Sequence, residues 1–189
     1  LEIESGAGDV VVTDFDIDGT VTTPNADLDS LTFNGTTANS FDVGDGGGTV
    51  ANATFTSTTG DTDAGTGDYE VTVDETVDVD GADGGAFDLE GPSAVEVSEA
   101  DGASFTIDSD GDVSVMQTDS AGEVDIGPNT DPAAVTVTGG EAGSYTVDAS
   151  EDARVSGVAT SDGGISVTDT ADDVTVNNSN VTLTAPGTG

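Results

Sequence analysis

The sequence contains no cysteine, histidine, lysine or tryptophan, and Arg154 is its only basic residue. Without cysteine the chain has neither a disulfide nor a thiolate metal site. Without histidine, cysteine and lysine it lacks the parts of a catalytic triad, a thiol nucleophile or a Schiff base. Without bases it cannot neutralise phosphates, which excludes nucleic acid as a partner. We therefore predict that the protein is not an enzyme and requires no cofactor.

Long apolar runs are also missing. No stretch approaches the roughly 20 apolar residues of a membrane-spanning helix, so no membrane insertion is expected. Charge, by contrast, is abundant, because 39 acidic residues face a single base and the net charge is −38. Such a chain repels itself and stays folded most easily in concentrated salt, where the Debye length shrinks to about 3 Å at 1 M.

The sequence does contain short triplets in which apolar and polar residues alternate, separated by glycine-rich turns. Two such strands recur about every 20 residues from position 68 onward, a period typical of solenoids. The pattern places Phe105 and Ile107 inside, Thr106 outside, and Val124 and Ile126 of the next repeat above them. This predicts an all-β fold, a β-solenoid built from two-strand repeats.

A β-sandwich or jelly roll is the alternative, because it uses the same alternating strands paired antiparallel. The spacing alone does not separate the two folds, although the similarity of successive repeats favours the solenoid. Residues 1–67 carry a looser version of the pattern, and residues 68–189 a regular one. We expect a single elongated domain in which the irregular N-terminal region continues into the regular array.

In its acidity, its lack of lysine and its repeat, the chain resembles secreted and cell-surface proteins of haloarchaea. The resemblance rests on composition and repeat pattern and covers no specific family. It implies an extracellular or cell-surface location and folding in high salt.

One short motif resembles an active site. Asp16-Ile17-Asp18-Gly19-Thr20 follows an apolar strand, as does the first motif of the haloacid-dehalogenase-type phosphatases, in which the first aspartate is the nucleophile. That family also needs a lysine or arginine beside the phosphoaspartate and alternating helices, and the sequence indicates neither. The competing interpretation is a strand that turns Phe15 and Ile17 inward and Asp14, Asp16 and Asp18 outward.

Acidic turns are candidate sites for Ca²⁺ or other cations. The best candidate ligands are Asp108, Asp110 and Asp112, which alternate around a glycine turn. The acidic run that starts at Asp14 is not an EF-hand, because its twelfth position is Asn25 where the EF-hand has a bidentate acid.

Four Asn-x-Ser/Thr sequons are candidate glycosylation sites outside the cell. Their acceptor residues are Asn34, Asn52, Asn177 and Asn180.

These observations predict a structural subunit of an extracellular filament, fibre or surface layer of a halophilic archaeon. Its expected partners are copies of itself, joined through uncapped β edges. The alternative is an adhesin, or a tail-fibre or spike-like module, that binds glycans or a cell surface. The phosphatase resemblance at Asp16 is the more distant alternative.

Overall fold

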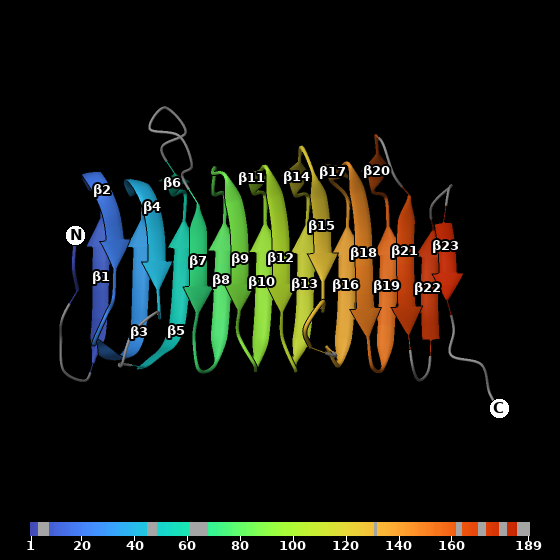
Figure 1. Ribbon diagram of the computed structural model, residues 1–189, viewed down its shortest axis with the longest axis horizontal. Helices are drawn as coiled ribbons and strands as arrows, with labels where there is room; N and C mark the ends of the chain where they lie inside the picture. The colour runs from blue at the N-terminus through green and yellow to red at the C-terminus, as the bar shows by residue number, and fades with distance from the viewer. Residues whose placement is uncertain are drawn as a thin grey trace.

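The chain folds into a β-solenoid with repeats of about 20 residues. The computed structural model describes residues 1–3, 8–44, 49–60, 68–130, 132–161, 164–169, 173–177 and 181–184 (Figure 1). The described residues contain no helix, and so none long and apolar enough to cross a membrane. The predicted all-β solenoid is confirmed.

Two long sheets form the broad sides, and their strands run in opposite directions in Figure 1. In spatial order, the first long sheet contains β1 (Asp9–Thr13), β3 (Asp27–Asn34), β5 (Thr49–Thr56), β8 (Thr76–Asp80), β10 (Ala94–Ser98), β13 (Asp112–Met116), β16 (Ala134–Thr138), β19 (Asp152–Ser156) and β22 (Asp173–Asn177). The second contains β2 (Asp16–Thr22), β4 (Thr37–Val43), β7 (Tyr69–Thr72), β9 (Ala86–Glu90), β12 (Ser104–Asp108), β15 (Glu123–Ile126), β18 (Ser144–Ala149), β21 (Ile165–Asp169) and β23 (Val181–Thr184).

A narrow side closes each turn between the two long sheets. It holds a short sheet of β11 (Asp101–Gly102), β14 (Asp119–Ser120), β17 (Glu141–Ala142) and β20 (Ala159–Thr160). The two-residue strand β6 (Thr59–Gly60) lies at the same corner and pairs with β4.

Every ladder between described strands is parallel, which separates the solenoid from the sandwich alternative. Phe105 pairs with Val124 and Ile107 with Ile126, as the sequence predicts, while Thr106 lies between them on the outer face. The ladders also run without interruption across position 67, because β4 pairs with β7 and β5 with β8. The strands up to β5 and those of the regular array therefore share the same sheets.

The core is one thin layer of side chains between the long sheets. Its N-terminal part contains six buried rings, whose neighbouring centroids lie 4.4–5.6 Å apart: Phe33, Phe41, Phe55, Tyr69, Phe87 and Phe105. After Phe105 the same column continues with Val124, Tyr145 and Ile165. The core is therefore aromatic at one end and mainly aliphatic at the other.

Each turn leaves the first long sheet through one residue with a left-handed φ. These corner residues are Asp14 (51°), Gly35 (61°), Ser57 (49°), Gly81 (64°), Glu99 (51°), Gln117 (49°), Gly139 (71°) and Gly157 (69°). Their backbone N–H groups continue the ladder, since Gly81 donates to the carbonyl of Ser98 and Glu99 to that of Met116, at 2.9 and 3.0 Å. Half of the corners lack glycine, although the left-handed region costs an L-residue about 1–2 kcal/mol.

The corner explains one wrong prediction. Ile17 is buried as expected, but Phe15 is 57% exposed. The chain turns at Asp14, so Phe15 begins a corner, at the place that buried Thr36 takes in the next turn. Later turns fill this place with Thr58, Ala82, Ala100 or Thr118, which are small enough for the narrow side. The alternating pattern gives no sign that a corner interrupts the strand.

Candidate functional site

A row of acidic residues lies on the narrow side. Asp83, Asp101, Asp119 and Glu141 occupy the same corner position in four successive turns and are joined by parallel pairing. We call this set the acidic column. It places a carboxylate on every rung over four turns, at the backbone spacing of about 4.8 Å that parallel strands impose. The sequence hides the column, because its members are separated by 18 to 22 residues.

The carboxylates of the acidic column repel one another. Partial burial, and then the charges of Asp83 and Asp119, raise the pKa of Asp101 above its ordinary value. The carboxylate of Asp119 accepts the backbone N–H of Glu141 at 2.8 Å, which fixes it along the column. The exposed acids on this edge can attract a diffuse layer of cations. The described residues nevertheless form no group of three acids with the geometry of a metal site.

The predicted cation ligands take different positions in the structure. Asp108 is buried at the end of β12 and its carboxylate accepts the backbone and side-chain N–H groups of Asn129, at 2.9 and 2.7 Å. The hydroxyl of Thr130 also donates to it at 3.3 Å. Asp110 and Asp112 are exposed. Asp108 therefore anchors the loop after β15, and the cation site at these three residues stays a prediction.

The phosphatase-like motif lies in β2. Asp16 and Asp18 are both exposed, and a bulge at Asp18 and Gly19 shifts the pairing of β2 with β4. Gly19 has a φ of 142°, which suits this bulge. The motif therefore acts here as a structural irregularity at the edge of the second long sheet.

The structure describes the acceptor side chains of two sequons, and these differ in exposure and hydrogen bonding. Asn34 is exposed at the end of β3, although the hydroxyl of its Thr36 is buried and directed at the carbonyl of Val12. The amide of Asn52 donates to the carbonyl of Asp29 and to Glu75 at 3.2 and 3.3 Å, and it accepts the hydroxyl of Thr76. Asn177 is the last residue of β22, and Asn180 lies outside the described residues. In the folded protein, Asn34 is thus the better placed acceptor of these two.

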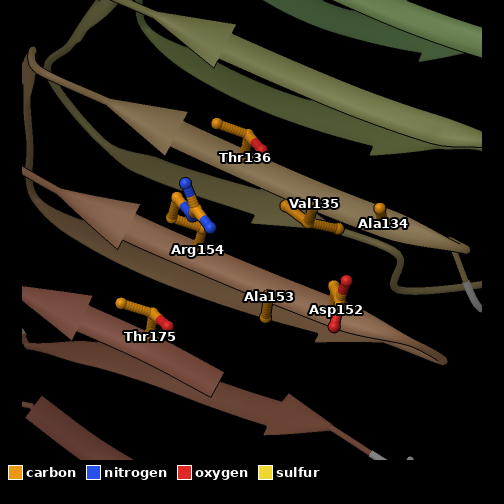
Figure 2. Close-up of a pocket in the computed structure, with 7 residues that line it drawn as sticks. All are labelled: Ala134, Val135, Thr136, Asp152, Ala153, Arg154 and Thr175. Atoms are coloured by element: carbon orange, nitrogen blue, oxygen red, sulfur yellow. The ribbon is translucent and has the colours of Figure 1, made fainter. Parts of the chain in front are cut away.

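Arg154 lies in the middle of β19, on the outer face of the first long sheet. It pairs in register with Thr136 and Thr175, and these three residues line a shallow groove together with Asp152 (Figure 2). No ion pair joins Arg154 to a carboxylate whose side chain the structure describes. The only base of the chain thus stands among threonines on a flat, exposed surface.

A second surface feature lies at the β1 end. Val11 is 66% exposed, and together with Leu1, Val12, Thr13 and Phe15 it lines an open apolar groove. Val11 and Phe15 are adjacent on the terminal turn, on either side of the corner residue Asp14. Large exposed apolar residues that gather in one place commonly mark a contact surface.

No family model, curated protein or solved structure matches the chain.

Proposed function

We propose that the protein is a structural subunit of an extracellular filament, fibre or surface layer of a halophilic archaeon. The observation that carries this proposal is the uninterrupted parallel register from β1 to β22 in the first long sheet. In such an array each rung is a template for the next, because every strand offers its neighbour the same row of backbone donors and acceptors.

The apolar surface at β1 supports assembly in which copies join by strand pairing at this end. Val11 and Phe15 form the exposed apolar surface there, and β1 pairs with β3 on its other side. A strand from a second copy that pairs with β1 would flank these side chains at the edge of the sheet and extend the ladder. The exposed acids of the broad and narrow sides would keep finished assemblies soluble in concentrated salt.

Electron microscopy in about 1 M NaCl, where the Debye length is about 3 Å, tests the proposal. We expect elongated assemblies of the wild-type protein and their loss in the double variant Val11→Asp, Phe15→Asp. Ala121→Asp is the matched control, because Ala121 is exposed at a corner far from β1. Monodisperse monomers of the wild-type protein at every concentration would overturn the proposal.

An adhesin or a spike-like module of a virus is the second candidate. The broad, flat outer faces of the long sheets favour it, since they offer an extended surface to a glycan or a cell wall. This candidate predicts an assembly of fixed size, and glycan binding that survives the Val11→Asp, Phe15→Asp double variant. Open polymers that lose their contacts in that variant would argue against it.

The proposal assigns no catalysis to the chain. Asp16 and Asp18 lie on an exposed bulged edge, and the sequence contains no lysine or histidine to act with them. If the phosphatase resemblance did reflect an activity, Asp16→Asn would abolish phosphate release from p-nitrophenyl phosphate. We expect no such release from the wild-type protein, measured with and without Mg²⁺.

A further inference from the structure

We propose that two copies of this chain pack face to face through the first long sheet. The axes of the two solenoids run antiparallel, and Arg154 of each copy lies against Glu96 of the other. The contact surface consists of the outward residues of β10, β13, β16 and β19. The inference does not rest on the proposed end-to-end assembly, because it uses a broad face and does not involve β1.

The charge along the middle row of this face is asymmetric. From β8 to β22 the row reads Asp78, Glu96, Ser114, Thr136, Arg154 and Thr175, in register across parallel strands. Asp78 and Glu96 are exposed neighbours, and partial burial followed by Glu96 raises the pKa of Asp78. The only base therefore lies three rungs from a pair of acids that repel one another. Between them lie only a serine and a threonine.

A two-fold axis parallel to the strands, between β13 and β16, brings these charges together. It places Arg154 opposite Glu96 of the second copy and Ser114 opposite Thr136. Asp78 then faces Thr175. The two copies are equivalent, so the Arg154–Glu96 contact forms twice, as an isologous interface requires.

The flanking rows fit the same arrangement. In the first row the exposed acids Asp112 and Asp152 face Ala134 and Ala94, which are small and uncharged. In the third row Met116, which is 47% exposed, faces Thr138. Every acid within these four strands thus faces an arginine or a small neutral residue, and Met116 loses contact with water.

Three other registers of the same two faces oppose like charges. An axis centred on β13 places Asp112 opposite its own copy, and an axis centred on β16 places Asp112 opposite Asp152. An axis along the solenoid places each rung against itself, so that Arg154 faces Arg154 and Glu96 faces Glu96. Like charges in contact disfavour association. The register between β13 and β16 avoids them and also places Arg154 opposite an acid, so we expect the surface to select it.

The contact is small. Four strands of five residues cover roughly 300 Å² per copy at about 4.8 Å between strands and about 3.3 Å per residue. This is below the roughly 800 Å² per partner of a standard stable interface. We therefore expect a weak dimer that forms at high protein concentration and in concentrated salt, where the long-range repulsion between two chains of net charge −38 is screened.

Sedimentation equilibrium in about 1 M NaCl, at a Debye length of about 3 Å, is the first test. We expect a concentration-dependent dimer of the wild-type protein and at least a tenfold weaker dimer for Arg154→Glu and for Glu96→Arg. The double variant Arg154→Glu, Glu96→Arg restores the dimer, because the charges exchange places. Glu90→Arg on the second long sheet is the control and leaves the dimer unchanged. A monomeric wild-type protein, or a double variant as weak as the singles, would overturn the inference.

Cross-linking tests the register without altering charge, and the chain has no cysteine of its own. A mixture of the Ser98→Cys and Ser156→Cys variants is expected to form dimers linked by a short bis-maleimide, because these outward residues of β10 and β19 face one another at the roughly 10 Å that separates stacked sheets, whereas each variant alone does not. Cross-linking of Ser98→Cys with itself would show a different register and overturn the inference. Because the Val11→Asp, Phe15→Asp variant leaves this face intact, its dimer persists even where end-to-end assemblies are lost.

Discussion

Between β3 and β12 the interior of the solenoid holds six aromatic rings, whereas between β13 and β21 Tyr145 is the only ring among valine, isoleucine and alanine. The backbone geometry is the same in both parts. Parallel ladders and left-handed corners continue with the same geometry through both halves. The comparison shows that the ladders and corners define the fold, and that the aromatic stack adds local stability to one half of it.

The size of that addition follows from the packing. Tyr69, Phe87 and Phe105 are stacked at 4.4 and 4.6 Å with nearly parallel planes. Aromatic pairs contribute about 0.5–1.5 kcal/mol beyond the burial of their area. In a repeat array, where each turn contacts only its neighbours, such differences remain local. We therefore expect the aromatic half to be the more stable half.

The largest expected effect is that of salt on the whole chain. As NaCl falls toward about 0.1 M, the Debye length rises to about 10 Å and the stacked carboxylates repel one another. We expect loss of the folded state, beginning in the aliphatic half because its core opposes the repulsion least. Hydrogen exchange by mass spectrometry at several salt concentrations measures the order. A circular dichroism spectrum that is unchanged over this range would contradict the expectation.

Removal of one ring tests the aromatic half directly. Phe87→Ala is expected to lower the free energy of unfolding by about 3–5 kcal/mol, the range for buried phenylalanines. Val124→Ala, two rungs further along the same column, removes two buried methyl groups and about 2 kcal/mol. Urea unfolding at fixed high salt measures both. Losses in proportion to the apolar area that each substitution removes would show that the stack contributes nothing beyond its apolar area.

Substitutions at the corner residues should have the same effect on stability in both halves of the core. Gly81 lies in the aromatic half and Gly139 in the aliphatic half, with φ of 64° and 71°, and an added methyl group meets no close contact at either. Gly81→Ala and Gly139→Ala are each expected to destabilise the protein by about 1–2 kcal/mol, from the left-handed φ alone. Gln117→Ala is the control, because its residue already carries a Cβ at such a corner. Losses that differ strongly between the halves would break the equivalence of the turns.

The two tyrosines occupy the same column and differ in their hydroxyl groups. The hydroxyl of Tyr69 donates to Thr58 at 3.0 Å, whereas that of buried Tyr145 has no hydrogen-bond partner among the described residues. Burial, followed by the charges of Asp119 and Glu141, raises the pKa of Tyr145 to about 12. In the turn that contains Tyr145, Gly140 follows the corner residue. In the turn that contains Tyr69, Thr58 takes this position.

This difference predicts opposite results for one substitution. Tyr69→Phe is expected to lower the free energy of unfolding by about 1 kcal/mol, because it removes a hydrogen bond and leaves Thr58 without its donor. Tyr145→Phe is expected to be neutral or slightly stabilising, since it removes a buried hydroxyl that has no partner. Thermal unfolding of both variants in the same salt decides the matter. A larger loss for Tyr145→Phe would contradict the assignment.

The smallest expected effect concerns pH. The pKa of Asp101 is raised in the folded state, so its ionised form opposes folding, and stability falls as pH rises from 3.8 through the raised pKa. We expect the melting temperature to rise as pH is lowered from 7 through this window. Asp101→Asn raises the melting temperature at pH 7 and shows a smaller change with pH. Asp110→Asn, at an exposed turn outside the column, serves as the control.

Much of the fold could be predicted from the sequence, because alternation and repeat length are local properties of the chain. Phe105, Ile107 and Val124 follow the predicted pattern, and the parallel ladders decide between solenoid and sandwich. The corners could not be predicted, since half of them lack glycine and nothing local indicates a left-handed φ at Glu99 or Gln117. The exposed Phe15 was missed for the same reason.

The candidate surfaces were harder to predict. The acidic column and the row through Arg154 exist only once the register is known, and turns of 18 to 24 residues between corners hide both in the sequence. Asp108 shows a role that the sequence pattern does not indicate, because its carboxylate accepts the backbone and side-chain N–H groups of Asn129. Composition predicts the chemistry of these surfaces, but the register decides which residues share one.

The spacing of the corner residues has a consequence for the length of the solenoid. Gly81, Glu99 and Gln117 stand 18 residues apart at equivalent backbone positions, since 99 − 81 and 117 − 99 are both 18. Excision of residues 82–99 would therefore join Gly81 to Ala100, a buried alanine that takes the place of Ala82. The product would be shorter by one rung, about 4.8 Å, with its remaining sheets in register. The length of the solenoid can thus change by one whole turn at a time, through duplication or deletion of a single 18-residue unit.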